Sequence, residues 1–228
     1  MGYYPYLARY LEALSVHGSE TLEIGLGFGT VGQILAERGA RYHGADIAPG
    51  PVAMMRDRLR WLGKPADESV LQVSALDLPW EDGHFDLVVS IGCLHHTGDL
   101  PRAVSEVHRL LRPGAVALVM LYNARSIRQV KVAVRERRLA RARGRGDRMM
   151  RAMYDTNSVG EAAPHTDFVT RRDARRLFRA FSQVAVQTQN VEAVTLRLPR
   201  RQYIIPRERL LGNLGRVLGL DLYIQAQK

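Results

Sequence analysis

The chain has 228 residues, of which 46% are hydrophobic and 25% are charged, an ordinary composition for one globular α/β domain. Its formal net charge is +10, and its single cysteine, Cys93, excludes an intramolecular disulfide and a cysteine-based zinc site. No apolar run is long enough to span a membrane and the N-terminus lacks a signal-peptide pattern, so we expect a cytoplasmic protein.

The first predicted element is an amphipathic helix over residues 3–14, with four apolar side chains on one face: Leu7, Tyr10, Leu11 and Leu14. A glycine-rich stretch, T-L-E-I-G-L-G-F-G-T, follows at residues 21–30. We expect it to join a short buried strand to a helix over residues 31–38. Its three glycines, Gly25, Gly27 and Gly29, allow positive φ and let a ligand lie against the backbone beside the helix N-terminus.

Two acidic residues lie at the ends of the first two predicted strands. Asp46 ends the strand over residues 41–47, 23 residues beyond Glu23, which is close to the roughly 20-residue spacing of a ribose-binding acid. A carboxylate accepts hydrogen bonds from both hydroxyls of a ribose. Glu23 would be costly to bury without a donor or cationic partner, and the amino group of a bound amino acid would satisfy it.

The chain resembles the class I S-adenosylmethionine-dependent methyltransferases, in the branch of ubiquinone/menaquinone-type and small-molecule enzymes. The resemblance covers residues 22–122 and rests on ordered motifs: E-I-G-L-G-F-G, G-A-D-I, L-P-W-E-D-G-H-F-D-L-V-V-S, L-H-H-T and E-V-H-R-L-L-R-P-G. It implies a single domain over residues 1–228 with a Rossmann-like, doubly wound, seven-stranded sheet. The sheet would be mostly parallel, with an antiparallel last strand. Residues 1–20 would form a helix that covers the cofactor or, as the alternative, only packs against the domain, and helical inserts would follow strands five and six.

The resemblance also implies S-adenosyl-L-methionine as cofactor and assigns its contacts. Glu23 would hold the methionyl amino group through the glycine turn, and Asp46 would hold the ribose. The adenine would lie beside Ile47, Ser74 and Ala75, although family members usually have an aspartate where Ser74 stands. Ser90, at the end of the predicted fourth strand, completes the cofactor-binding set.

His95 and His96 follow the fourth strand, at the edge where an open parallel sheet binds ligands. An imidazole is suited to accept the proton that a hydroxyl or amine nucleophile loses, so these two residues are the catalytic candidates, with His96 favoured. The alternative is that they only shape the pocket. Adjacent histidines are a poor metal pair, and no metal site is expected. The strand tip also lacks the proline-rich motif of enzymes that methylate base amines in DNA.

Three further residues are expected to face the substrate: Tyr122, Asn123 and His165. The alternatives are that Tyr122 packs, that Asn123 caps the next helix and that His165 belongs to the scaffold of a loop. His165 lies in the first insert, residues 124–169, which we expect to act as a lid. The second insert covers residues 191–219, where an apolar face is either core or a dimer contact.

The first insert also carries most of the charge, since residues 125–151 hold eleven Arg or Lys against Glu136 and Asp147. This segment is a solvated face, a site for an acidic partner or anionic membrane surface, or a site for RNA phosphates. Without aromatic residues in the segment, nucleic acid is not expected. We therefore expect methyl transfer to an O, N or C nucleophile of a small organic acceptor in biosynthesis. The alternatives are an RNA-modifying methyltransferase and a non-catalytic, cofactor-binding partner protein.

Overall fold

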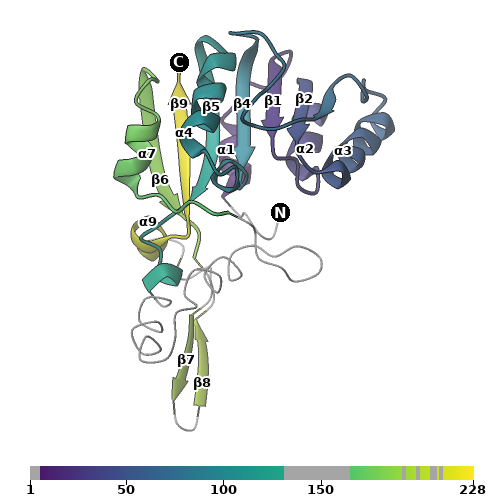
Figure 1. Ribbon diagram of the computed structural model, residues 1–228. Coiled ribbons are helices and arrows are strands. Elements are labelled where there is room, and N and C mark those ends of the chain that lie inside the picture. The colour runs from purple at the N-terminus through teal and green to yellow at the C-terminus, as the bar shows by residue number, and fades with distance from the viewer. Residues whose placement is uncertain (1–5, 131–164, 192–193, 199–200, 206–209, 211–212) are drawn as a thin grey trace.

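The computed structural model describes residues 6–130, 165–191, 194–198, 201–205, 210 and 213–228. Figure 1 shows a central sheet with helices packed on both of its faces. The elements that position the site are α1 (Leu7–Glu12), β1 (Glu20–Ile24), α2 (Thr30–Glu37), β2 (Arg41–Asp46), α3 (Pro49–Trp61), β3 (Val70–Gln72), β4 (Phe85–Ile91), η1 (Leu94–His96), α4 (Leu100–Leu110) and β5 (Leu111–Tyr122). The later elements are α7 (Arg171–Leu177), β6 (Gln183–Gln189), β7 (Val194–Leu198), β8 (Arg201–Ile205), α9 (Asn213–Leu218) and β9 (Asp221–Gln227).

The sheet has seven strands in the order β3-β2-β1-β4-β5-β9-β6. The pairings from β3 to β5 are parallel, whereas β9 runs antiparallel to both of its neighbours, β5 and β6. This arrangement confirms the predicted Rossmann-like sheet with an antiparallel last strand. All strands except β9 therefore end at one edge, which we call the carboxyl edge.

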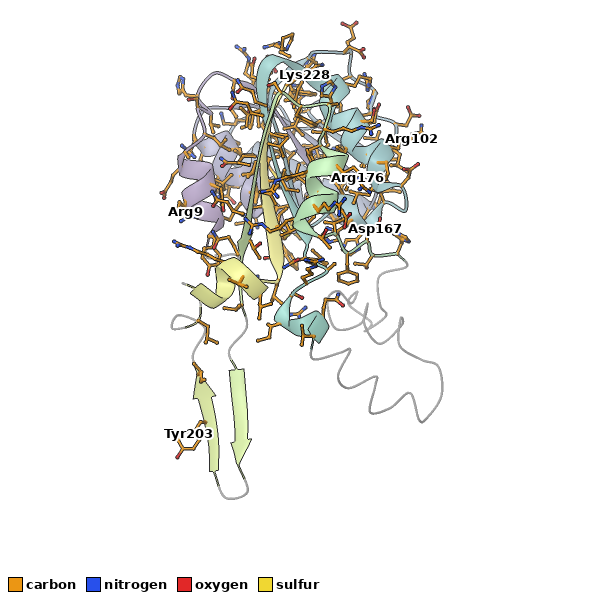
Figure 2. The ribbon with its side chains drawn as sticks, turned by 90° about the vertical axis from the view of Figure 1, so that its left-hand side faces the viewer. Arg9, Arg102, Asp167, Arg176, Tyr203 and Lys228 are labelled. Atoms are coloured by element: carbon orange, nitrogen blue, oxygen red, sulfur yellow. The ribbon has the colours of Figure 1, made fainter. Side chains whose placement is uncertain are left out.

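The central strands are buried because helices cover both faces of the sheet. Four of the five residues of β1 are buried, and the same holds for Leu87, Val88, Val89 and Ser90 in β4. On one face, α4 and α7 pack Val104, Val107 and Phe178 against the sheet. On the other, α1, α2 and α3 pack Leu11, Leu35 and Met55 against it. Figure 2 shows these two layers edge-on, with Arg9 of α1 and Arg176 of α7 on opposite sides.

The helices begin where the sequence supplies caps. Asp99 accepts a hydrogen bond from the amide of Arg102 at the start of α4 (3.0 Å), and Thr170 and Asp173 form a reciprocal capping box at the start of α7. None of the helices in the described part of the chain combines the length and the apolar character that crossing a bilayer requires.

The first helix lies flat on the sheet. Tyr10 stacks on Tyr223 of β9 with a ring-centroid distance of 4.6 Å, and its hydroxyl donates to Gln187 of β6 at 2.7 Å. Arg38, at the end of α2, donates to the carbonyl of Leu11. These contacts place α1 over β9 and β6, and none of them involves the glycine turn that follows β1. The predicted role of α1 as a cover for the cofactor therefore stays a prediction.

The two inserts are described in part. Most of the arginine-rich segment lies outside the described residues, because residues 131–164 are not among them. The second insert contains the antiparallel pair β7–β8 as well as the helix α9, whereas the sequence indicated only helical character there. Figure 1 shows this hairpin projecting beyond the carboxyl edge, and Figure 2 shows Tyr203 on it, clear of the body of the domain.

Candidate active site

The glycine turn joins β1 to α2 at the carboxyl edge. Gly25, Gly27 and Gly29 all have left-handed backbones, with φ of 84°, 50° and 71°. The amide of Gly25 donates to Ala45 of β2 at 2.8 Å, which ties the start of the turn to the neighbouring strand. Three left-handed residues within five positions require glycine, because a Cβ atom makes this conformation costly for other residues.

The three glycines differ in what surrounds them. A Cβ atom on Gly25 would lie 2.2 Å from Cβ of Cys93, and one on Gly29 would lie 2.8 Å from the Arg58 side chain. A Cβ atom on Gly27 would meet nothing within 4 Å. Close packing therefore requires glycine at Gly25, whereas at Gly29 the contact is with the flexible Arg58 side chain and the left-handed backbone is the firmer requirement. Gly27 instead borders open space at the carboxyl edge, as a backbone that receives a ligand must.

Asp46 lies at the tip of β2, beside this turn. One carboxylate oxygen accepts from the amide of Leu26 in the glycine turn at 2.8 Å, and the other accepts from the amide of Ala48 at 2.9 Å. These bonds fix the carboxylate between the turn and the start of α3. Each oxygen keeps a further acceptor position, so Asp46 remains able to receive ribose hydroxyls.

Two exposed apolar side chains lie next to these residues. Ile47, the predicted neighbour of adenine, is 72% exposed, and Phe28 in the glycine turn is 79% exposed. The sequence analysis did not assign Phe28 a role.

Glu23 is buried beneath α2 rather than open to the carboxyl edge. The hydroxyl of Tyr42 donates to its carboxylate at 2.5 Å, and the amide of Gly32 is a second donor. The pKa of Glu23 is raised to about 8, chiefly because of burial and also because of the nearby charge of Asp46, while the hydrogen bonds from Tyr42 and Gly32 oppose the shift. The sequence missed Tyr42 and Gly32, because their approach to Glu23 depends on how α2 packs.

A Cβ atom on Gly32 would lie 2.5 Å from both the Glu23 carboxylate and the Tyr42 hydroxyl. Glycine is therefore needed at this position for α2 to pack over the pair. Through this contact Glu23 supports the helix that follows the glycine turn. The Glu23 carboxylate already accepts from Tyr42 and Gly32, and its predicted hold on the methionyl amino group through the glycine turn stays a prediction.

The remaining predicted cofactor residues lie at the tips of β3 and β4. Ser74 uses its hydroxyl to accept from the amide of Leu76 at 3.2 Å, and Ala75 is 9% exposed. Ser90 is fully buried, and its hydroxyl donates to the carbonyl of Ile24 at 2.8 Å. Ser90 thus ties β4 to β1, and its contact with a cofactor stays a prediction that this burial does not favour.

His95 and His96 lie in η1, directly beyond β4. The His95 ring is fully buried, 4.0 Å from the ring centroid of Tyr122 and 4.2 Å from that of His96. His96 is only partly buried, and its Nδ1 lies 2.9 Å from the carbonyl oxygen of His165. Because a carbonyl oxygen only accepts, Nδ1 of His96 carries the proton of this hydrogen bond.

The loop before α7 holds His96 from the other side. Thr166 donates through its hydroxyl to the His165 carbonyl at 2.8 Å, and its oxygen lies 3.2 Å from Nδ1 of His96. The amide of Asp167 donates to the carbonyl of His95 at 2.8 Å. The His165 side chain lies 3.1 Å from the Asp167 carboxylate, so the described contact of His165 with the histidine pair is made by its backbone.

Tyr122 and Asn123 end β5 beside the histidine pair. Tyr122 is 7% exposed and lies close to the rings of His95 and Phe168. Asn123 is 2% exposed, donates to the carbonyl of Gly219 at 2.7 Å and accepts from the amide of Arg125 at 3.0 Å. Both residues therefore match their structural alternatives, and a contact with substrate stays a prediction.

Two hollows border other parts of the domain, and the second is also lined by Asp167 and Phe168, which contact His95 and Tyr122. One, of about 650 Å³, is lined by Arg9, Tyr10, Arg171 and Arg216 among others, and the second, of about 620 Å³, lies between α4 and α7. None of the described residues that line either hollow belongs to the glycine turn. We therefore place the candidate site at the carboxyl edge because of the glycine turn, Asp46 and the histidine pair, and not because of a hollow.

Residues 22–119 match the family described as a methyltransferase domain. These residues are a methyltransferase domain. The curated proteins that it resembles are named as methyltransferases, and the solved structures that share its fold include S-adenosylmethionine-dependent methyltransferases. The glycine turn, Asp46 and the histidine pair all lie within the matched residues.

The methyltransferase domain is similar to enzymes that act on different acceptors. The chain is 30% identical to the malonyl-[acyl-carrier protein] O-methyltransferase of Halorhodospira halophila, over 65% of this chain and 52% of that protein. It is also 30% identical to the ubiquinone biosynthesis O-methyltransferase of Pseudomonas aeruginosa, over 49% of this chain and 48% of that protein. The chain thus spans about half the length of these curated relatives.

The fold is shared over nearly the whole chain with solved structures. A structure of an S-adenosylmethionine-dependent methyltransferase from Methanosarcina mazei superposes with a TM-score of 0.62. The match covers 99% of this chain and 97% of the other at 19% identity. At this identity the similarity shows the fold alone.

Proposed function

We propose that this protein transfers a methyl group from S-adenosylmethionine to an oxygen, nitrogen or carbon nucleophile of a small organic acceptor in biosynthesis. The observation that carries the proposal is the open, left-handed Gly27 beside the Asp46 carboxylate, at the same sheet edge as His96. This edge is where open α/β sheets bind ligands. The family match over residues 22–119 supports the same conclusion.

The residues at this edge fit the cofactor. Gly27 would admit the cofactor chain against the backbone, and Asp46 would receive the ribose hydroxyls. Ile47, Ser74 and Ala75 would border the adenine, with Phe28 as a further apolar neighbour. When bound, the cofactor supplies an electrophilic methyl group on a sulfonium centre. The protein's task is then to align the acceptor and, for a hydroxyl or amine, to remove its proton.

His96 is the residue suited to that proton transfer. Its Nδ1 donates to the His165 carbonyl, so in the neutral ring the lone pair belongs to Nε2. In many enzymes a partner group binds one ring nitrogen of a catalytic histidine and thereby orients the other nitrogen, which takes the proton from the substrate. His95 is fully buried and packs against both His96 and Tyr122, which suits a positioning role.

The alternatives rest on parts of the chain that the structure describes only in part. RNA methylation, and docking to an acidic partner or an anionic membrane surface, both depend on the arginine-rich residues 125–151, and residues 131–164 lie outside the described part. They stay predictions. A non-catalytic role has no support from the described residues, because the glycine turn, Asp46 and His96 lie together at the carboxyl edge, where they would serve cofactor binding and proton transfer.

Calorimetric titration with S-adenosylmethionine and S-adenosylhomocysteine tests the proposal. We expect both to bind, and Gly27→Ala to weaken binding of both. A panel of phenol, carboxylate and amine acceptors is then assayed with methyl-labelled cofactor, with His96→Ala as the inactive comparison. If neither ligand binds, the cofactor assignment is wrong. If both bind but no acceptor of any class is methylated, the non-catalytic alternative is favoured.

A further inference from the structure

Three side chains with metal-ligating atoms meet at the amino edge of the sheet, opposite the glycine turn. They are Glu20, the first residue of β1, His43 in β2, and His84, one residue before β4. One ligand atom from each lies within 4.8 Å of the other two. We propose that Glu20, His43 and His84 form a binding site for a divalent transition metal, with zinc as the favoured ion.

The distance between two of the ligand atoms is close to that of a metal site. Oε2 of Glu20 lies 3.1 Å from Nε2 of His43. Two ligands at zinc distances of about 2.0–2.2 Å are about 3.3–3.5 Å apart when the coordination is tetrahedral. A zinc ion would replace the proton that these two atoms share, and a shift of a few tenths of an ångström would accommodate it.

The carboxylate is already oriented for this role. Arg41 holds the other oxygen of Glu20, with Nε 2.6 Å from Oε1, which leaves Oε2 directed at His43. Ligating carboxylates in metal sites are commonly held by such an outer hydrogen bond. The Arg41 side chain is 64% exposed, so solvent screens its charge from a bound cation.

His43 is held in place by its neighbours. Its ring makes edge-to-face contacts with Trp80, Phe85 and His84, at centroid distances of 6.0, 5.4 and 5.8 Å. Among the described residues, the buried Nδ1 of His43 has no hydrogen-bond partner. Protein groups therefore leave the ring incompletely satisfied.

The donor set indicates the ion. Two imidazoles and one carboxylate suit zinc and its neighbours among the divalent transition metals, and they do not suit calcium or magnesium, which need several oxygens. Three protein ligands leave a fourth position for water. Because the ligands come from β1, β2 and the start of β4, a bound metal would clamp adjacent strands at the edge away from methyl transfer.

The test is titration of the purified full chain with Zn²⁺ and with Co²⁺, whose visible absorption reports four-coordinate geometry. We expect one Zn²⁺ to bind per chain, a cobalt spectrum typical of four-coordination, and a raised melting temperature. His84→Ala and Glu20→Gln should each weaken Zn²⁺ binding at least tenfold, since even outer-shell changes cost about 10–100-fold. His17→Ala, which removes an exposed histidine elsewhere, should bind as the unaltered protein does.

Circular dichroism of each variant confirms that it is folded before titration. Glu20→Gln keeps the size of the side chain, so it separates loss of a ligand from loss of packing. The proposal is overturned if the unaltered protein binds no Zn²⁺. It is also overturned if folded His84→Ala and Glu20→Gln bind Zn²⁺ as tightly as the His17→Ala control, or if binding is lost instead in His95→Ala or His96→Ala.

Discussion

Gly25 is needed for tight packing, whereas Gly27 leaves open space for a ligand. Substituting the two glycines one at a time therefore tests the site. Gly27→Ala places a methyl group on a left-handed backbone at φ 50°, with no protein atom within 4 Å. The strain costs about 1–2 kcal/mol of the free energy of unfolding. If the cofactor lies against this backbone, the methyl group overpacks the complex by about 1–3 kcal/mol. Cofactor affinity should then fall about 5- to 150-fold.

Gly25→Ala should behave differently. Its φ is 84°, and the new Cβ atom would lie 2.2 Å from Cβ of Cys93. The backbone cost of about 1–2 kcal/mol therefore adds to an overpacking cost of about 1–3 kcal/mol. We expect a loss of about 2–5 kcal/mol in the free energy of unfolding, well beyond the effect of Gly27→Ala.

Gly63→Ala is the matched control. Gly63 has φ 66° and open surroundings, like Gly27, but it follows α3 rather than the glycine turn. It should lose the same stability as Gly27→Ala and keep its cofactor affinity. Denaturant unfolding and calorimetric titration of the three variants provide the comparison. Unchanged affinity in a folded Gly27→Ala variant would refute the placement of the cofactor against this residue.

Three further predictions follow from the described contacts. His96→Ala should lower kcat about 10²–10⁴-fold for a hydroxyl or amine acceptor and abolish the increase of kcat with pH. Equal pH profiles of kcat for the variant and the unaltered protein in steady-state assays would argue against a base. Glu23→Gln should flatten the pH dependence of stability: the folded pKa of about 8 lies above the ordinary glutamate pKa of 4.5, so the free energy of unfolding falls by up to about 1.4 kcal/mol per pH unit as pH rises between these two values. Unfolding at pH 5.5 and pH 8 checks this, and parallel curves for the two proteins would contradict it. The pKa of the Cys93 thiol is raised to about 12, chiefly by burial. A thiol reagent at pH 8 should therefore modify the folded protein far more slowly than the denatured chain. Equal rates would show that the thiol is accessible and ionises normally in the folded protein.

Local patterns predicted the first helix, the glycine turn and the strand over residues 41–47, because each such element depends on residues close in the sequence. The seven-stranded sheet was implied by the resemblance to class I methyltransferases. The hairpin β7–β8 was missed. Residues 194–198, V-T-L-R-L, do alternate apolar and polar side chains, but the insert was expected to be helical, and the pairing with residues 201–205 is visible only in the structure.

For the site, the sequence by itself determined which residues gather at the carboxyl edge. Strand tips in a parallel sheet meet at one edge, so Gly27, Asp46 and His96 were identified from their positions alone. Their orientations were decided by tertiary structure. The contact of His96 with the His165 carbonyl joins segments 69 residues apart, and no local pattern encodes it.

The same distinction separates the two ends of the sheet. At the carboxyl edge, each candidate site residue lies in or directly after a recognisable strand or turn, so order along the chain was informative. At the amino edge, Glu20, His43 and His84 are isolated in sequence and carry no motif. Only the parallel register, which pairs β2 with β1 and β1 with β4, brings them within 4.8 Å of one another. Strand pairing is a long-range property, and for that reason the structure alone revealed this cluster.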